Sequence, residues 1–102
     1  MVIDSLTALE YFCMEDFELF TGVHSFLRFL SESRVTTLLT AEMPETGKVG
    51  FESLLTRGEI RLHKLRQADR LWRGISVEKY RGSPHDDHMR PLRITEKGLV
   101  IG

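Results

Sequence analysis

The apolar positions in the first part of the chain predict two strands with a helix between them. Residues 1–5 form a short apolar run that ends in a carboxylate, and residues 34–41 are β-branched and almost continuously apolar, which favours a parallel strand covered on both faces. Between them, apolar residues recur at three- and four-residue steps over residues 15–33, which is the period of a helix. The recurring positions are Phe17, Phe20, Val23, Leu27 and Leu30. This order predicts a right-handed crossover, with a further short helix over residues 5–14.

The helix predicted over residues 15–33 has more apolar surface than one sheet face needs. Leu19, Phe26 and Phe29 widen its apolar stripe. We therefore expect part of this surface to be buried against another chain. His24 lies beside the stripe, where a packed or solvent-facing histidine is the simplest interpretation.

The second part of the chain has the alternating pattern of antiparallel hairpins. Residues 58–64 and 71–81 are expected to pair as two strands joined by a turn. Residues 90–102 are expected to form another hairpin, which turns at Glu96-Lys97-Gly98. A loop over residues 42–50, rich in proline and glycine, separates the two parts.

The end of the strand over residues 71–81 carries candidate chemistry. Ile75 and Val77 fall on one face at period two, and Lys79 and Arg81 are expected to continue that face about 6–7 Å apart. A lysine supplies a point charge and an arginine a flat fork of donors, so the pair suits a phosphate group. The alternative is an edge strand whose basic side chains are solvated.

A polar loop follows this strand, because Gly82, Ser83 and Pro84 end it. The loop carries His85, Asp86, Asp87 and His88. These four residues could bind a metal ion, but adjacent loop residues rarely converge on an ion without ligands from elsewhere.

Two sequence motifs lie near the end of the chain and a third lies at its start. Lys-x-Arg-Gly-Ser-x-His spans residues 79–85, Arg-Ile-Thr-Glu-Lys-Gly spans residues 93–98, and Asp-Ser-Leu-Thr-Ala-Leu spans residues 4–9. In this order they resemble the ATPase domain of KaiC-like proteins, which are RecA-related P-loop ATPases. The resemblance makes Asp4, with Ser5, part of the Walker B segment, a weak magnesium site that acts through water. A local alternative is that one of these two residues caps the following helix.

The resemblance implies an α/β fold: a partial RecA-like core in which two parallel strands with a crossover helix are followed by antiparallel β-hairpins. It covers residues 1–102 as a single truncated domain, from the Walker B strand to the last strand. In this family the P-loop strand lies between the strands that match residues 35–41 and 58–64. Without it, two apolar edges are open, which is a liability unless they are covered. The two strands could pair directly or another chain could fill the gap, and we favour a homodimer or higher oligomer.

The phosphate-binding loop of these ATPases does not occur in the 102 residues. It requires Gly-x-x-x-x-Gly-Lys-Ser/Thr. Gly47-Lys48 comes nearest, but Glu42 stands where the first glycine is needed and Val49 follows the lysine. The acidic residue that lies between Walker A and Walker B in the family is missing as well. We therefore predict that the chain alone does not hydrolyse ATP, and that ATP and Mg²⁺ bind only with a P-loop-bearing partner.

The resemblance also implies a role across a subunit boundary. In KaiC-like hexamers, residues matching Lys79, Arg81 and His85 reach the nucleotide held by the neighbouring subunit. Lys79, Arg81, Ser83 and His85 are accordingly expected to contact a nucleotide in trans, in the manner of an arginine finger. The chain would then be an oligomeric or regulatory module, with a second copy or a KaiC/RecA-like ATPase as its partner.

Two other functions are compatible with the residues. Basic side chains are concentrated in the first hairpin: Arg61, Lys64, Arg66, Arg70, Arg73, Lys79 and Arg81. With Trp72, whose ring could stack on a base, they would suit a small nucleic-acid-binding protein that uses Trp72, Arg70 and Arg73. The third hypothesis is a truncated product of a complete KaiC/RecA-like ATPase.

Composition limits these hypotheses. The chain has 102 residues and a net charge of −1, which leaves room for one domain and argues against bulk electrostatic binding to nucleic acid or membranes. Cys13 is the single cysteine, so no internal disulfide is possible and a reducing cytosol is favoured. No apolar run reaches the roughly 20 residues needed to cross a bilayer, and the first residues lack the basic segment of a signal peptide. We expect a cytoplasmic protein with no membrane partner.

Overall fold

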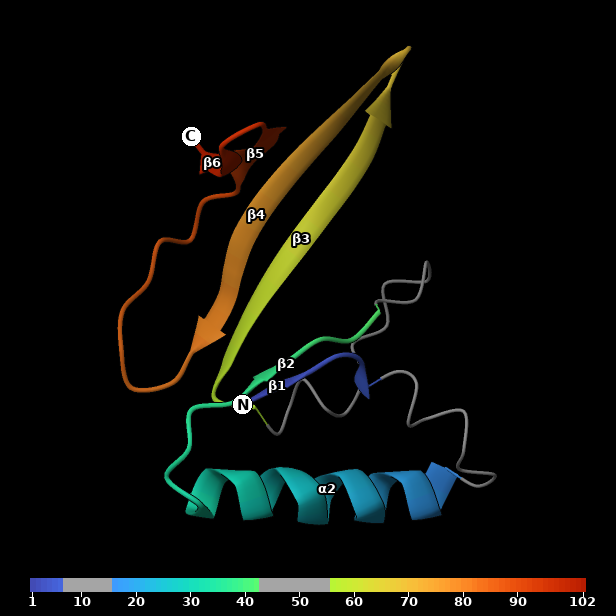
Figure 1. Ribbon diagram of the computed structural model, residues 1–102, viewed down its shortest axis with the longest axis vertical. Helices are drawn as coiled ribbons and strands as arrows, with labels where there is room; N and C mark the ends of the chain where they lie inside the picture. Colours follow the sequence, from blue (N-terminus) through green and yellow to red (C-terminus); the bar gives the residue numbers. More distant parts are fainter. Residues whose placement is uncertain (7–15, 43–55) are drawn as a thin grey trace. The chain divides into compact units, whose positions relative to one another are not determined.

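The computed structural model describes residues 1–6, 16–42 and 56–102 (Figure 1). The chain consists of two compact units, Met1–Thr56 and Arg57–Gly102. Each unit has its own secondary structure and is considered by itself.

Some sequence-based expectations fall outside the described residues. These are most of the helix expected over residues 5–14, including Cys13, the loop that contains Gly47 and Lys48, and the side chains of Phe17, Leu19 and Phe20. They stay predictions.

The first unit has the strand, helix and strand that the sequence predicts (Figure 1). β1 (Val2–Ile3) and β2 (Leu38–Leu39) pair in parallel, with Val2 opposite Leu38. α2 (Asp16–Glu32) connects them in sequence. Both strands are shorter than expected, but their type and direction are confirmed.

The apolar stripe of α2 covers one face of the two strands. Leu6, Val23, Leu27 and Leu30 are buried, and Ile3, Phe26 and Leu39 are partly buried against them. The three- and four-residue period that predicts the helix therefore also identifies its buried face. Among the described helices, none combines the length and the apolar character required to cross a membrane.

The opposite face of the strands is not covered by the described residues of this unit. Val2 and Leu38 are 69% and 62% exposed. The strand expected over residues 34–41 is therefore covered on one face by the described residues of this unit, and coverage of its other face stays a prediction. On α2, Phe29 is 66% exposed, in line with the expected surplus of apolar surface.

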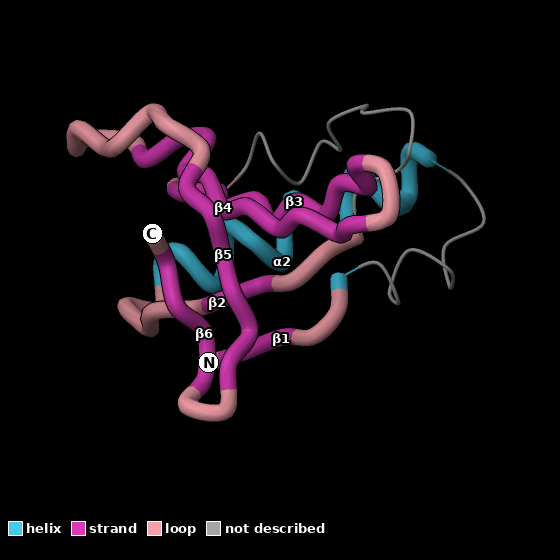
Figure 2. Tube along the Cα trace, turned by 90° about the horizontal axis from the view of Figure 1, so that it is seen from above, coloured by secondary structure: helices cyan, strands magenta, loops and turns pink. Residues whose placement is uncertain are grey.

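The second unit contains four antiparallel strands in the order β3-β4-β5-β6 (Figure 2). β3 (Gly58–Gln67) and β4 (Arg70–Tyr80) form a long hairpin. β5 (Arg90–Thr95) and β6 (Gly98–Ile101) form a short one. Both hairpins expected from the alternating pattern are confirmed.

The turns of the two hairpins differ in how they are stabilised. Ala68 and Asp69 join β3 to β4, and Ala68 has a φ of 55°. In the short hairpin, Oγ1 of Thr95 donates to the carbonyl oxygen of Gly98 at 2.8 Å and accepts from the amide of Lys97 at 3.2 Å. Gly98 has a φ of 113°, which glycine adopts without a Cβ clash. The turn before β6 therefore has glycine at its positive-φ position, whereas the turn between β3 and β4 has alanine there.

The long hairpin presents two different faces, because successive residues of a strand point to opposite sides. One face carries the cross-strand pairs Ile60–Val77, Leu62–Ile75 and Lys64–Arg73. The other carries Arg61–Ser76, His63–Gly74 and Leu65–Trp72. The basic residues expected to form one patch are therefore divided between two faces.

Candidate functional site

The carboxyl ends of β1 and β2 lie next to each other at one edge of the parallel pair. Asp4 directly follows β1 and Thr40 directly follows β2. The amide of Thr40 donates to the carbonyl oxygen of Ile3 at 3.0 Å, and the amide of Leu6 donates to that of Thr40 at 2.7 Å. Open sheets with parallel strands bind ligands at this edge. Asp4 thus lies where a Walker B aspartate is expected.

The side chain of Thr40 fixes one oxygen of Asp4. Its Oγ1 donates to Oδ1 of Asp4 at 2.6 Å, and both residues are exposed. Ser5 follows through a cis peptide bond and is partly buried. The alternative that Asp4 or Ser5 caps a helix concerns residues outside the described ranges, so it stays a prediction, as does the magnesium site.

The side chains of β4 do not alternate regularly between the two faces of the hairpin near Lys79. Val77 pairs with Ile60, whereas Lys79 pairs with Glu59, so β4 has one more residue than β3 at this point. Such a bulge interrupts the alternation of side chains between the two faces. The uninterrupted alternation expected up to Arg81 is therefore wrong, and Arg81 itself lies beyond the last residue of β4.

Lys79 and Arg81 nevertheless act on each other electrostatically. The Lys79 side chain is partly buried, and burial lowers its pKa below the ordinary value. The positive charge of Arg81 lowers this pKa further, whereas the negative charge of Glu59 raises it. Two cations held near each other repel, and an anion placed between them would relieve that repulsion. That Lys79 and Arg81 bind a phosphate group stays a prediction, and the carboxylate of Glu59 also acts on Lys79.

Ser83 and His85 follow on an exposed loop. Gly82 has a φ of 84°, and the amide of Ser83 donates to the carbonyl oxygen of Tyr80 at 3.4 Å. The Ser83 hydroxyl donates to the carbonyl oxygen of the next residue at 3.1 Å, and Nδ1 of His85 lies 3.1 Å from the carbonyl oxygen of Asp86. The loop thus leaves β4 through a tight turn and is held mainly by contacts within itself.

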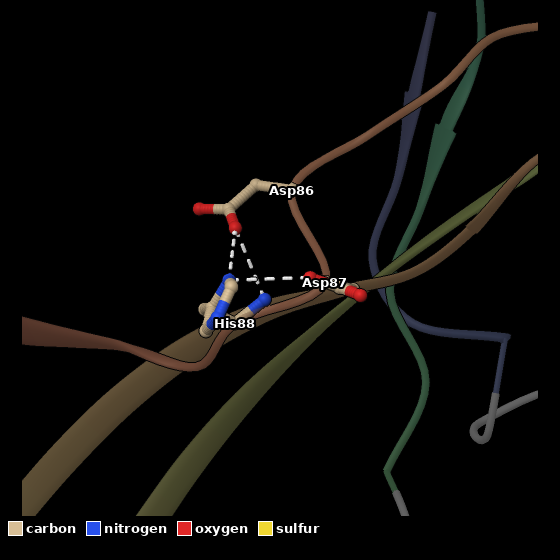
Figure 3. A group of neighbouring side chains, drawn as sticks. All are labelled: Asp86, Asp87 and His88. Carbon is tan, nitrogen blue, oxygen red and sulfur yellow. Dashed lines mark hydrogen bonds and ion pairs between the residues drawn. The ribbon is translucent and has the colours of Figure 1, made fainter.

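Asp86, Asp87 and His88 form a cluster in the same loop (Figure 3). The amide and Nδ1 of His88 each lie 3.0 Å from Oδ1 of Asp86, and Nδ1 lies 3.2 Å from Oδ1 of Asp87. Oδ2 of Asp86 accepts from Nε of Arg90 at 2.7 Å. The hydrogen bond from Arg90, followed by those from His88, holds the pKa of Asp86 well below its usual range. Asp86 is therefore the residue around which this part of the loop is ordered.

A metal ion at this cluster would compete with those hydrogen bonds. The three side chains can bring one ligand atom each to within 4.8 Å of one another, and all three are exposed. Both oxygens of Asp86 already accept charge-assisted hydrogen bonds. The internal structure of the loop explains the cluster without an ion.

The residues of the nucleic-acid hypothesis do not share one surface. Trp72 and Arg73 are consecutive in the regularly paired part of β4, so their side chains lie on opposite faces, and Arg70 pairs with Gln67 beside the turn. The Trp72 ring packs over Gly74, because a Cβ at Gly74 would lie 2.6 Å from its Cη2. Nucleic-acid binding stays a prediction, but Trp72 has a packing role.

The sequence did not identify Arg57, which lies beside the candidate site. It immediately precedes β3. Its Nε donates to the carbonyl oxygen of Arg81 at 3.2 Å, and its Cζ lies 6.0 Å from the centroid of the Tyr80 ring. One signal in the sequence could have identified it. Arg57 directly precedes the strand expected over residues 58–64, and the partner strand expected over residues 71–81 ends in the basic motif.

Comparisons with known proteins give consistent results. A family model described as the KaiC ATPase matches residues 1–102. The solved structure of a KaiC-like protein from the hyperthermophilic archaeon Pyrococcus horikoshii OT3 is similar, with 28% sequence identity and a TM-score of 0.85 over 99% of this chain. The chain spans 45% of the length of that protein. A comparison with curated proteins gave no match.

Proposed function

The chain belongs to the KaiC family of ATPases, and on this basis we propose that it contacts a nucleotide held by a P-loop outside these 102 residues. One observation carries the proposal. The family match covers all 102 residues, and none of them forms the Gly-x-x-x-x-Gly-Lys-Ser/Thr sequence that cradles the phosphates. The chain has the part of the ATPase domain that follows this loop and, alone, does not hydrolyse ATP.

The proposed contact surface is the corner at the end of β4. Lys79 and Arg81 supply positive charge, and Ser83 and His85 supply donors on the adjoining loop. Phosphoryl transfer is accelerated mainly by positioning and by cations placed where negative charge develops. The positive charge of Arg81 lowers the pKa of Lys79, after the larger effect of burial, which supports a role in which both cations face one anion.

Asp4, in the first unit, is proposed to act on the magnesium ion that accompanies a nucleotide. Its carboxylate offers oxygen, the ligand type that Mg²⁺ prefers, at the edge where parallel strands bind ligands. Thr40 donates a hydrogen bond to one of its oxygens, which restrains the carboxylate. When bound with a nucleotide, Mg²⁺ would neutralise phosphate charge, and Asp4 with Ser5 would hold it through water.

We also propose that the chain works as an oligomer or with a P-loop-bearing KaiC/RecA-like partner, in the cytoplasm. Val2, Leu38 and Phe29 expose large apolar side chains in the first unit. Exposed apolar surface of this kind supports association with another chain. The single cysteine is compatible with a reducing compartment.

Light scattering of the chain mixed with a P-loop-bearing KaiC-family ATPase tests the proposal. The mass of the complex is expected to rise when a non-hydrolysable ATP analogue is added, because the analogue phosphates contribute contacts to Lys79 and Arg81. The Arg81→Ala chain should lose this nucleotide dependence, and Arg28→Ala, which removes an exposed arginine that pairs with Glu32 in the other unit, should keep it. Tight binding of ATP by the chain alone would contradict the proposal.

A further inference from the structure

Arg57 bonds to both main-chain groups of Arg81. Its carbonyl oxygen accepts from the amide of Arg81 at 3.0 Å. Its Nε donates to the carbonyl oxygen of Arg81 at 3.2 Å. One residue therefore holds the peptide groups on both sides of the Arg81 Cα, at the point where the chain leaves β4.

The guanidinium of Arg57 also lies near the residues on either side of Arg81. Its Cζ lies 6.0 Å from the centroid of the Tyr80 ring. A Cβ at Gly82 would lie 3.4 Å from its Nη2, and Gly82 has the positive φ that makes the turn. The Tyr80 ring is itself placed by Gly58, where a Cβ would lie 3.0 Å from its Cδ2. The Arg57 side chain therefore lies along the corner from Tyr80 to Gly82 and bonds to its middle residue.

A restraint on the backbone matters here because Lys79 and Arg81 are both positively charged. The positive charge of Arg81 lowers the pKa of Lys79, because it disfavours the charged form of that side chain. The Arg81 side chain is exposed, so its direction depends on how its own backbone is held. Arginine suits the task better than lysine, since its planar fork can donate from Nε while Nη2 lies against the turn.

We propose that Arg57 is a positioning residue for Arg81. It sets the direction in which the Arg81 side chain leaves the corner, toward the phosphates of the nucleotide held outside this chain. The inference rests on the proposed function, and it adds a residue that acts only through Arg81. Arg57 itself does not touch the phosphates.

A double-mutant cycle on ATP turnover tests this role. The full chain is added to a P-loop-bearing KaiC-family ATPase whose own residues matching Lys79, Arg81 and His85 have been replaced by alanine. Arg57→Ala is expected to lower the turnover that the chain stimulates by about tenfold or more, the scale of effect produced by a misplaced group. In the Arg81→Ala background, the same change should alter turnover less than twofold, because groups that act as one unit are non-additive. Arg93→Ala is the matched control, since it removes an exposed arginine from β5 and should leave turnover unchanged.

Two further measurements separate positioning from a general loss of structure. Urea unfolding followed by Trp72 fluorescence shows whether each variant keeps the fold of the second unit, and Arg57→Lys replaces Arg57→Ala if the latter does not fold. Arg57→Lys is expected to fold and to recover less than half of the lost turnover. Amide exchange at Arg81 should be about fivefold faster in Arg57→Ala, the effect of removing one hydrogen bond nearby.

The outcomes distinguish this inference from the proposed function. If Arg81→Ala abolishes stimulation but Arg57→Ala matches the natural chain, the inference is wrong and the proposed function stands. Additive losses from the two substitutions would also overturn the inference. If Arg81→Ala itself leaves stimulation unchanged, the proposed function fails, and the inference fails with it.

Discussion

The hydroxyl of Thr40 donates a hydrogen bond of 2.6 Å to Oδ1 of Asp4, although the two residues are 36 positions apart. The contact exists because β1 and β2 run parallel, so their carboxyl ends meet at one edge. It joins Asp4, the proposed Walker B aspartate, to the end of the next strand. The fold of the first unit thus determines how this carboxylate is presented.

Replacing Thr40 with valine should weaken the first unit. The substitution removes the donor to Asp4, and a hydrogen bond of this kind contributes about 1 kcal/mol to the free energy of unfolding. Urea unfolding followed by circular dichroism at 222 nm measures the effect, because α2 supplies the helical signal of this unit. Thr40→Ser retains the hydroxyl and is the control. Equal stability of the valine and serine variants would show that the hydrogen bond contributes nothing.

Alanine substitutions at Leu27 and Phe29 should have very different effects on the free energy of unfolding, although both residues lie on α2. Leu27 is 8% exposed and belongs to the core, so Leu27→Ala is expected to lower the free energy of unfolding by about 2–4 kcal/mol. Phe29 is 66% exposed, so Phe29→Ala should change it by less than about 0.5 kcal/mol. The same Phe29 variant should instead reduce the mass of any oligomer, measured by light scattering over a range of concentrations. A large loss of stability in Phe29→Ala would mean that this face is internal packing.

The turn between β3 and β4 should be stabilised by glycine. Ala68 has a φ of 55°, and a left-handed backbone costs a residue with a Cβ roughly 1–2 kcal/mol. Ala68→Gly is therefore expected to raise the free energy of unfolding of the second unit by about 0.5–1 kcal/mol, since part of the gain is offset by the entropy of glycine. Trp72 fluorescence in urea follows the transition. At Asp69, which is not among the described residues with a positive φ, glycine should destabilise, and a gain there would contradict the assignment of the strain to Ala68.

The contact between Asp86 and Arg90 should persist in mild acid. Hydrogen bonds from Arg90 and His88 lower the pKa of Asp86 in the folded chain below the unfolded value of about 3.9. Their contribution to stability is therefore fully present above that value and is lost as the pH falls through the lower folded pKa. Carboxyl carbon NMR should find Asp86 still ionised at pH 4. Arg90→Gln should move the titration toward the ordinary value, whereas a midpoint at or above it in the natural chain would contradict the contact.

The sequence predicts the elements well where one physical requirement dominates. The stripe of Val23, Leu27 and Leu30 can be buried only on a helix, and this stripe forms the core. The alternation of residues 58–64 and 71–81 requires a hairpin, and both strands form it. Asp4 could be placed at a strand end because an apolar run stops there.

The details of the site depend on strand register, side-chain contacts and surface coverage, and the pattern of apolar and polar residues does not determine these. A register shift between Glu59 and Ile60 alters the faces near Lys79, and nothing in the alternation of residues 75–81 signals it. The bond from Arg57 to Arg81 depends on which residues the pairing of β3 and β4 brings together. The exposure of Val2 and Leu38 depends on which surface covers the strands. A run of apolar residues predicts that a surface is buried but does not identify what buries it.

The proposed role of this chain is to supply cations to a nucleotide bound outside its own residues. The direct measurement is ATP turnover by the chain alone, by a P-loop-bearing KaiC-family ATPase without its own matching Lys, Arg and His, and by the mixture. We expect no turnover by the chain, restored turnover in the mixture, and a loss of roughly 10³-fold when the chain carries Arg81→Ala. Magnesium-dependent turnover by the chain alone would contradict this role. So would a mixture whose turnover is unchanged by Arg81→Ala.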